Sequence, residues 1–139
     1  MVAVTKDEKY IRYFAKLAET SKPVRGARMV AGLVYKNDIV AMGTAQHKTH
    51  PFQSRFGKNE AAIYLHAEID CIKNALKVTS KIDIAKSTLY VARRKFLHTD
   101  QKFFENGLAC PCSGCRAAIV AFDISRTVFT LDGTGYQVL

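Results

Sequence analysis

The sequence lacks every feature that would place the chain in a membrane or send it across one. No apolar run approaches the roughly 20 residues that a helix needs to cross a bilayer. Residues 1–9 are charged and have no apolar core, so they do not resemble a secretion signal. From these absences we expect a cytoplasmic protein with no membrane partner.

Cysteine is scarce, and internal repetition is absent. The chain has only 4 Cys among its 139 residues. Without a secretion signal we expect them in a reducing compartment, where paired cysteines hold metals more often than they form disulfides. The sequence shows no repeat, low-complexity tract or linker, so we expect one domain over residues 1–139.

Acidic residues are outnumbered by basic ones. The chain has 21 Lys and Arg against 12 Asp and Glu, a formal net charge of +9. Such a balance favours polyanions and phosphorylated substrates, although a merely soluble basic surface has the same composition. There is no long polybasic tail, and the nearest approach to one is Arg93-Arg94-Lys95. Charge alone therefore leaves a small phosphorylated ligand and a nucleic acid both open.

Two short stretches carry the residues that suit metal chemistry. The first reads H-x-E over residues 66–68, and the second reads P-C-x-x-C over residues 111–115. One imidazole and two thiolates are three good zinc ligands, one short of a closed tetrahedral site, and catalytic sites leave that fourth position open. The predicted Zn²⁺ ligands are His66, Cys112 and Cys115. Glu68 lies two residues from the imidazole, so it is the predicted proton carrier at the open position.

The order of these motifs resembles the cytidine and deoxycytidylate deaminase superfamily, whose zinc signature is H-x-E followed by P-C-x-x-C. The resemblance implies that His66, Cys112 and Cys115 bind zinc and that Glu68 moves protons. It also implies a three-layer α/β/α fold, with a mixed sheet of four to five strands and helices on both faces. Relatives commonly form dimers or larger assemblies, so a homo-oligomer is expected by analogy.

The implied activity is hydrolytic deamination that depends on zinc. A cytosine nucleoside or nucleotide, such as cytidine, CMP or dCMP, would be converted to the uracil form with release of ammonia. A base deaminase acting on polynucleotide, either tRNA or single-stranded DNA, is the alternative that the positive charge favours. A zinc-stabilised binding module without activity is a third hypothesis, and the intact Glu68 argues against it.

Apolar periodicity and turn residues predict the elements around the motifs. Thr5 and Glu8 have the spacing of a capping box, which predicts a helix over residues 6–21. Two apolar runs flank the turn residues 36–38 and predict a hairpin whose strands are covered on both faces. The expected strands are 28–35, 39–44, 87–93, 126–131 and 136–139, and the expected later helices run over 66–77 and from Pro111 onward.

Two expected loops flank the motifs and supply candidate substrate contacts. Residues 46–59 mix cations with aromatics, which suits a phosphate and a stacked base, or equally a solvated loop with two anchoring Phe. By resemblance, Gln46 stands where relatives have an Asn that contacts the sugar. The other candidate substrate-binding residues are Ala67, Arg55, Lys58 and Arg94, with Arg93 as a further candidate for the phosphate.

The second expected loop, residues 94–109, would gate the site or grip the substrate. Its His98 is a conceivable fourth zinc ligand, but it would leave no open position for Glu68 to serve. Two cysteines fall outside the ligand pattern. Cys71 lies deep in the expected helix and is interpreted as a small buried hydrophobe, and Cys110 precedes the helical spacing of the other pair.

Overall fold

The computed structural model describes residues 5–24, 28–47, 51–56, 65–97 and 103–139. In chain order the elements are α1 (Lys6–Thr20), β1 (Arg28–Tyr35), β2 (Asp38–Thr44), α2 (Pro51–Phe56), α3 (Ala67–Leu76), α4 (Lys81–Ala85), β3 (Thr88–Phe96), β4 (Phe104–Gly107), α5 (Ser113–Ala121), β5 (Arg126–Thr130) and β6 (Tyr136–Val138). Among these helices, none combines the length and the apolar character that crossing a membrane requires.

A six-stranded mixed sheet forms the middle layer. Its order is β2-β1-β3-β5-β6, and β4 pairs with the outer half of β3. The β3–β5 pair is parallel, whereas the other pairs are antiparallel. The predicted α/β fold is confirmed, with one strand more than expected because β4 lies in the segment predicted as a loop.

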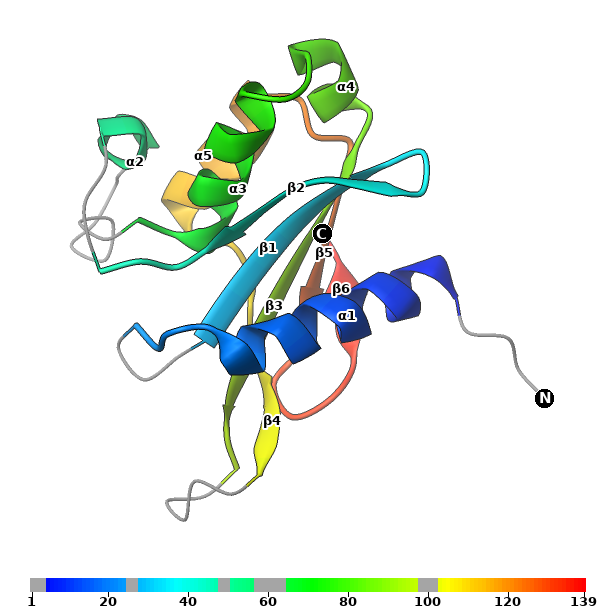
Figure 1. Cartoon of the computed structure of the whole chain (residues 1–139), viewed down its shortest axis with the longest axis vertical. Coiled ribbons are helices and arrows are strands. Elements are labelled where there is room, and N and C mark those ends of the chain that lie inside the picture. Colours follow the sequence, from blue (N-terminus) through cyan, green and yellow to red (C-terminus); the bar gives the residue numbers. More distant parts are fainter. Residues whose placement is uncertain (1–4, 25–27, 48–50, 57–64, 98–102) are drawn as a thin grey trace.

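Helices cover both faces of this sheet (Figure 1). On one face, here called the α1 face, α1 packs on β1, β3 and β5. Its core includes Tyr10, Phe14 and Tyr90, and Phe14 leaves no room for a side chain at Gly32, where a Cβ would lie 2.0 Å from the ring. The opposite face, here called the α3 face, carries α3 and α5 over a second apolar core. Both predicted motifs therefore lie on the α3 face.

The first helix and the hairpin follow the sequence signals closely. Thr5 caps α1, because its hydroxyl accepts a hydrogen bond from the backbone N–H of Glu8 at 3.1 Å. The carboxylate of Glu8 pairs with Arg12, so only the first half of the predicted capping box forms. In the hairpin, Lys36 and Asn37 both have positive φ, at 50° and 67°. This matches a type I′ turn within the turn residues 36–38 that the sequence predicts.

The largest departure from prediction is the segment predicted as a loop over residues 94–109. Strand β3 continues to Phe96, and the chain returns as β4, forming an arm that extends beyond the rest of the sheet (Figure 1). Phe96 and Phe104 are cross-strand partners whose rings stack at 4.5 Å, and the Arg28 guanidinium lies over both. Such aromatic and cation–π pairs stabilise a hairpin, which explains why this segment is sheet.

Candidate active site

Each predicted motif lies at the N-terminal end of a helix on the α3 face. His66 is the N-cap residue of α3, with φ −78° and ψ 152°, and Cys112 is the N-cap residue of α5, with φ −70° and ψ 173°. Cys115 follows in the first turn of α5. Helix α5 begins at Ser113, so Pro111 lies just before the helix, not in its first turn as predicted. Both helices direct their positive N-terminal ends toward this point, which favours thiolates.

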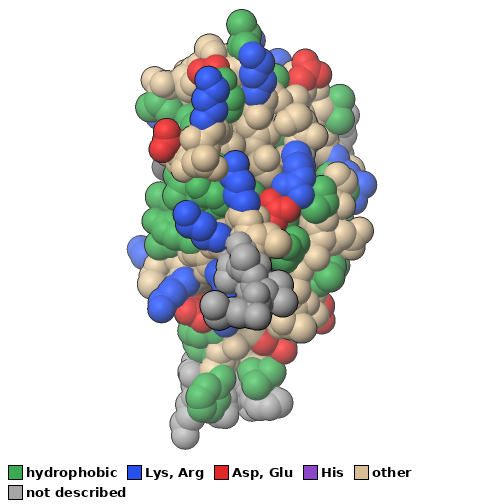
Figure 2. All heavy atoms as spheres, turned by 90° about the vertical axis from the view of Figure 1, so that its right-hand side faces the viewer, with side chains coloured by type: hydrophobic (Ala, Val, Ile, Leu, Met, Phe, Trp, Pro, Cys, Tyr) green, Lys and Arg blue, Asp and Glu red, His purple; other side chains and the backbone are tan. Residues whose placement is uncertain are grey.

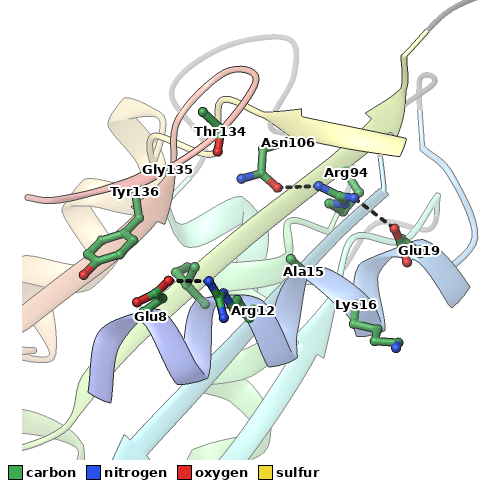
Figure 3. A pocket seen from close by; sticks show the side chains of 11 residues that line it. Glu8, Arg12, Ala15, Lys16, Glu19, Arg94, Asn106, Thr134, Gly135 and Tyr136 are labelled. Atoms are coloured by element: carbon green, nitrogen blue, oxygen red, sulfur yellow. Dashed lines mark hydrogen bonds and ion pairs between the residues drawn. The ribbon is translucent and has the colours of Figure 1, made fainter. Parts of the chain in front are cut away.

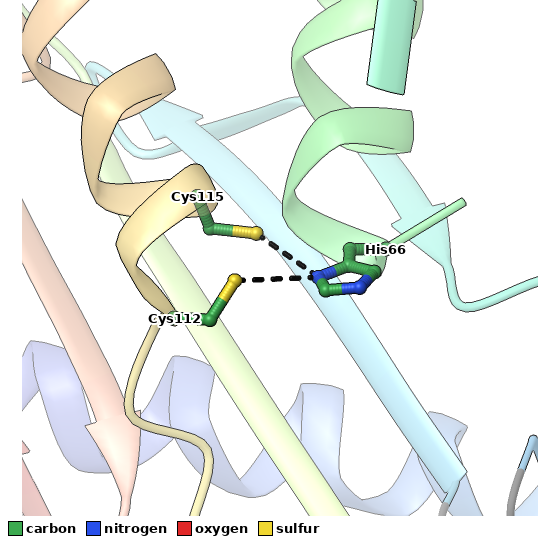
Figure 4. A group of neighbouring side chains, drawn as sticks. All are labelled: His66, Cys112 and Cys115. Atoms are coloured by element: carbon green, nitrogen blue, oxygen red, sulfur yellow. Dashed lines mark hydrogen bonds between the residues drawn. The ribbon is translucent and has the colours of Figure 1, made fainter. Parts of the chain in front are cut away.

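The three predicted ligand atoms lie close together (Figure 4). His66 Nδ1 is 3.6 Å from Cys112 Sγ and 3.3 Å from Cys115 Sγ, and all three atoms lie within 4.8 Å of one another. A tetrahedral Zn²⁺, with Zn–N of about 2.0–2.1 Å and Zn–S of about 2.3 Å, requires an N···S separation of roughly 3.6 Å. The spacing of these side chains therefore fits one shared zinc ion.

The pKa values of the two thiols are shifted in opposite directions. Hydrogen bonds from Cys115 and from His66 lower the pKa of Cys112 to about 3. The same bond to Cys112, together with burial, raises the pKa of Cys115. One thiolate is thus stabilised by its neighbours, and a metal ion at this point would displace the proton held by the other thiol.

Glu68 is almost fully buried beside these ligands. It occupies the second position of α3 and is 3% exposed. Burial is the main influence on its carboxyl and raises the pKa, and the nearby His66 and a hydrogen bond with Cys115 act in the opposite direction. No salt bridge to Glu68 forms within the described residues. A buried carboxyl without a cationic partner is costly, which is typical of a group that handles protons.

Gln46 lies at the end of β2, next to the start of α3. Its backbone N–H donates to Leu65 O at 2.9 Å, and its side-chain Nε2 donates to Asp70 Oδ2 at 3.1 Å. The same carboxylate oxygen accepts the backbone N–H of Thr44 at 3.1 Å. Asp70 therefore fixes Gln46 beside the residue that precedes His66, and the carbonyl oxygen of the Gln46 amide is left as an acceptor.

The other candidate substrate residues are spread over the molecule. Ala67 opens α3 and is 1% exposed, so its side chain packs inward. Arg55 lies against Phe56 and lines a small cavity with Phe122 and Asp123 at the C-terminal end of α5. The structure thus places Arg55 at the end of α5 that is opposite to the two cysteines. Lys58 lies outside the described residues.

Arg94 lies on the α1 face, away from the motifs. Its guanidinium donates to Asn106 Oδ1 at 2.7 Å and pairs with Glu19 at 3.0 Å, inside a cavity of about 500 Å³ between α1, β3 and β4 (Figure 3). Side chains alternate between the two faces of a strand, and Tyr90 and Ala92 already belong to the α1 face. By the same alternation Arg93 lies on the α3 face, which is the face that carries the motifs.

Arg93 is held in place by the arm. Its aliphatic stem covers Gly107, where an added Cβ would lie 2.7 Å from Arg93 Cδ. Its Nε is buried and has no hydrogen-bond partner among the described residues. Arg93 thus lies in the second half of β3 on the motif face, and a guanidinium there can donate hydrogen bonds to an anion.

The remaining cysteines stand apart from the ligand cluster. Cys71 is fully buried, its Sγ lies 3.6 Å from Ala41 O, and burial raises the pKa of its thiol. Cys110 is half-buried and accepts a contact from the Arg116 guanidinium at 3.0 Å. His98 lies outside the described residues.

Sequence reasoning missed Gln53. It lies in α2, within the segment predicted as a loop, and its Oε1 accepts the backbone N–H of His66 at 3.0 Å. Two signals predict α2 in retrospect: Pro51 suits a first helical position, and Phe52 and Phe56 have the i, i+4 spacing of one helical face. The two Phe anchor α2 on Phe122, as the solvated-loop hypothesis expected of them.

Comparison with known proteins agrees with this geometry. Residues 4–131 match the family described as the cytidine and deoxycytidylate deaminase zinc-binding region. The match spans most of the chain, so this protein belongs to the cytidine and deoxycytidylate deaminase family and is a deaminase. The family is zinc-binding, and the His and two Cys of the present structure provide a metal site that fits Zn²⁺.

Two solved structures of a dCMP deaminase from the cyanophage S-TIM5 share the fold. The apo form is 21% identical over 90% of this chain and 82% of that chain, with a TM-score of 0.58. The form in complex with dCMP and dUMP is 18% identical over 94% and 85% of the two chains, with a TM-score of 0.60. No curated protein sequence matches this chain. At these identities the structural likeness establishes the fold and not the substrate.

Proposed function

We propose that this deaminase is zinc-dependent and hydrolyses the amino group of a cytosine mononucleotide, with dCMP as the representative substrate. The observation that carries the proposal is the cluster of His66 Nδ1, Cys112 Sγ and Cys115 Sγ, which has the spacing of a shared tetrahedral metal and has the buried Glu68 beside it. The solved relative with dCMP and dUMP bound supports a nucleotide substrate.

In this proposal His66, Cys112 and Cys115 hold Zn²⁺. When bound, zinc supplies Lewis-acid chemistry that lowers the pKa of a water molecule toward neutrality. Glu68 accepts a proton from the attacking water and passes it to N3 of the cytosine ring. The remaining hydroxyl forms a bond to C4, and Glu68 then takes the proton of this hydroxyl and delivers it to the amino group as the C4–N bond breaks, so that water and the cytosine become ammonia and the uracil. Because Glu68 is buried, bulk water does not compete for these protons.

The residues proposed to contact the substrate are those that lie on the same face of the sheet as the two motifs. Gln46 stands at the rim of the site, held by Asp70, with its amide oxygen available to a sugar hydroxyl. For the phosphate, Arg93 replaces the Arg94 of the sequence-based hypothesis, because Arg94 projects to the α1 face and already binds Glu19 and Asn106. By strand alternation, Arg93 and Lys95 are the β3 cations on the α3 face, and Lys95 already pairs with Glu105 and Asp132.

Deamination of a polynucleotide is the alternative to be tested. It would require a continuous basic band along which several phosphates bind. Figure 2 shows the side of the molecule that faces away from α2, and there Lys and Arg side chains lie among acidic and neutral groups. The net charge of +9 by itself does not separate the two substrates, so the experiment includes both.

The experiment is an assay of ammonia release by the zinc-loaded protein. The panel is cytosine, cytidine, deoxycytidine, CMP, dCMP, dCTP, single-stranded DNA and tRNA, and Glu68→Ala is the blank. Turnover of dCMP or CMP above the nucleosides is the expected result. Turnover of the polymers alone, weakening steeply as salt is raised, would replace this proposal with nucleic-acid editing. Absence of turnover in the zinc-loaded protein would favour a binding module.

A further inference from the structure

Helix α2 connects the two helices that carry the proposed zinc ligands. Phe52 and Phe56 of α2 pack against Phe122 at the end of α5, with ring centroids 6.0 Å and 6.4 Å from it. Between these two residues, Gln53 points to the start of α3 and binds the backbone of His66. A six-residue helix thus joins α5 to the first proposed ligand of α3.

Gln53 accepts the hydrogen bond of the His66 backbone N–H, for which the sequence of α3 provides no acceptor of its own. The backbone N–H of an N-cap residue is commonly bound by the side chain of the third helical residue, in a capping box. In α3 that residue is Ile69, which is apolar and fully buried. The side chain of His66 makes no cap hydrogen bond either. Gln53, which lies in another helix, therefore binds the N-cap N–H that the third helical residue binds in a capping box.

The burial of Gln53 indicates that its hydrogen bond to His66 offsets an energetic cost. The residue is 1% exposed, and its Nε2 is buried with no hydrogen-bond partner among the residues described. A buried amide donor without a partner is unfavourable. An apolar side chain of the same size would avoid that penalty, so the advantage of Gln53 must come from its other end, the Oε1 that binds His66.

We propose that Gln53 is a positioning residue for the zinc site. By holding the N–H of His66 it fixes where α3 begins, and with it the distance from Nδ1 to the sulfurs of Cys112 and Cys115. A site arranged in this way binds metal more tightly, because fewer conformations must be lost when the ion arrives. The inference rests on the proposed function, since it takes these three side chains as the zinc ligands.

The test variant is Gln53→Met, which keeps the length and volume of the side chain and removes the acceptor. The matched control is Ser80→Ala, which removes the cap of α4, a hydrogen bond of 3.2 Å to the N–H of Asp83, in the chain that follows the C-terminal end of α3. Zinc affinity is measured by competition with a chromophoric chelator, and the ligand geometry by the visible spectrum of the Co²⁺-loaded protein. Thermal unfolding of the metal-free proteins gives the loss of stability.

We expect Gln53→Met to weaken zinc binding about tenfold or more, the size typical of changes around the ligands, and to shift the Co²⁺ bands. Ser80→Ala should lose stability and keep the wild-type affinity and spectrum. A second variant, Gln53→Glu, retains an acceptor for the His66 N–H, and its affinity should stay above that of Gln53→Met. Equal zinc affinity in wild type, Gln53→Met and Ser80→Ala would overturn the inference.

The same measurements separate this inference from the proposed function. If the wild-type protein binds zinc but deaminates no nucleotide, the proposed function fails while the affinity of Gln53→Met still decides the role of Gln53. If the wild-type protein binds no zinc, both fail together. If dCMP is turned over and Gln53→Met binds zinc normally, only the positioning role is wrong.

Discussion

The start of α1 and the starts of the two motif helices, α3 and α5, are built in opposite ways. On the α1 face, the hydroxyl of Thr5 caps α1 by binding the N–H of Glu8. On the α3 face, the N-cap side chains of α3 and α5, His66 and Cys112, make no cap hydrogen bond and lie against each other instead. A good N-cap stabilises a helix by about 1 kcal/mol, so the α3 face forgoes this stabilisation twice. We infer from this difference that the two helix ends serve to bring the proposed metal ligands together.

The acidic residues at the second helical position differ in the same way. In α1 this residue is Asp7, which binds Arg126 through both carboxylate oxygens and accepts the Tyr90 hydroxyl at 2.8 Å. In α3 it is Glu68, buried beside the proposed zinc ligands without a salt bridge to any of the described residues. One carboxylate thus joins α1 to the sheet, and the other is left available for chemistry.

The largest expected effect comes from exchanging these two acids for their amides. Glu68→Gln should lower kcat for dCMP by about 10²–10⁴, the usual contribution of acid–base catalysis, and should leave zinc bound and the fold stable. Asp7→Asn should keep kcat and lower the free energy of unfolding by about 1–2 kcal/mol, because Arg126 is partly exposed and its ion pair is screened. Steady-state kinetics, metal analysis and urea unfolding measure the two changes. Full activity in Glu68→Gln would remove it from the mechanism.

The consecutive residues Arg93 and Arg94 allow the two faces of the sheet to be compared directly, because their side chains lie on opposite faces. Arg93→Ala should raise KM for dCMP about tenfold and leave KM for deoxycytidine unchanged, because the lost bond is to a charged phosphate. Arg94→Ala should leave both KM values unchanged and lower the free energy of unfolding, because Arg94 links Glu19 of α1 to Asn106 of β4. The reverse result, with only Arg94→Ala sensitive to the phosphate, would return the phosphate to the α1 face.

Substituting the N-cap residues of α5 and α1 should have a smaller effect, raising the stability of the metal-free protein in the first case and lowering it in the second. Cys112→Ser introduces a better N-cap, so the metal-free protein should become more stable by roughly 0.5–1 kcal/mol while tight zinc binding is lost. Thr5→Ala should destabilise the protein by about 1 kcal/mol and leave zinc affinity unchanged. Chemical unfolding in the presence of a chelator, followed by zinc titration, checks both. A less stable metal-free Cys112→Ser protein would show that the thiol stabilises α5 in another way.

The smallest expected effect is the loss at acidic pH of the stability that Asp7 contributes. Hydrogen bonds from Arg126 hold the pKa of Asp7 below its ordinary 3.8. A carboxylate with a lowered folded-state pKa adds stability above its unfolded pKa, and that stability is lost as pH falls through the folded value. The stability difference between wild type and Asp7→Asn should therefore be constant near neutral pH and shrink below about pH 4. A difference that does not shrink in acid would show that the ion pair is not its source.

Much of the motif face could be predicted from the sequence, because its residues are local in the chain. H-x-E and P-C-x-x-C each lie at a helix start, and helical spacing separates Cys112 and Cys115 from Cys110. The face of Arg94 could also have been predicted, since it alternates with Tyr90 and Ala92 along β3. That prediction required β3 to extend past Arg93, which the apolar pattern alone did not indicate.

The parts that sequence reasoning missed depend on distant contacts. β4 forms because Phe104 stacks on Phe96 and Arg28 lies over both rings, a contact between three separate segments. Gln53 matters only because α2 folds against Phe122 and places its amide at His66. Neither contact has a local sequence pattern, so neither could be read from periodicity or motif spacing.

The assignment of His66, Cys112 and Cys115 as the zinc ligands is tested most directly by X-ray absorption at the zinc edge of the purified, zinc-loaded protein. We expect two sulfur ligands at about 2.3 Å and one imidazole nitrogen at about 2.0–2.1 Å, with one further oxygen or nitrogen ligand. With enough zinc added to saturate the weaker site of Cys112→Ser, the loss of a single sulfur ligand would support the assignment. A site with three or four sulfurs, or with none, would contradict it, because His66, Cys112 and Cys115 would not then be the residues that hold the metal.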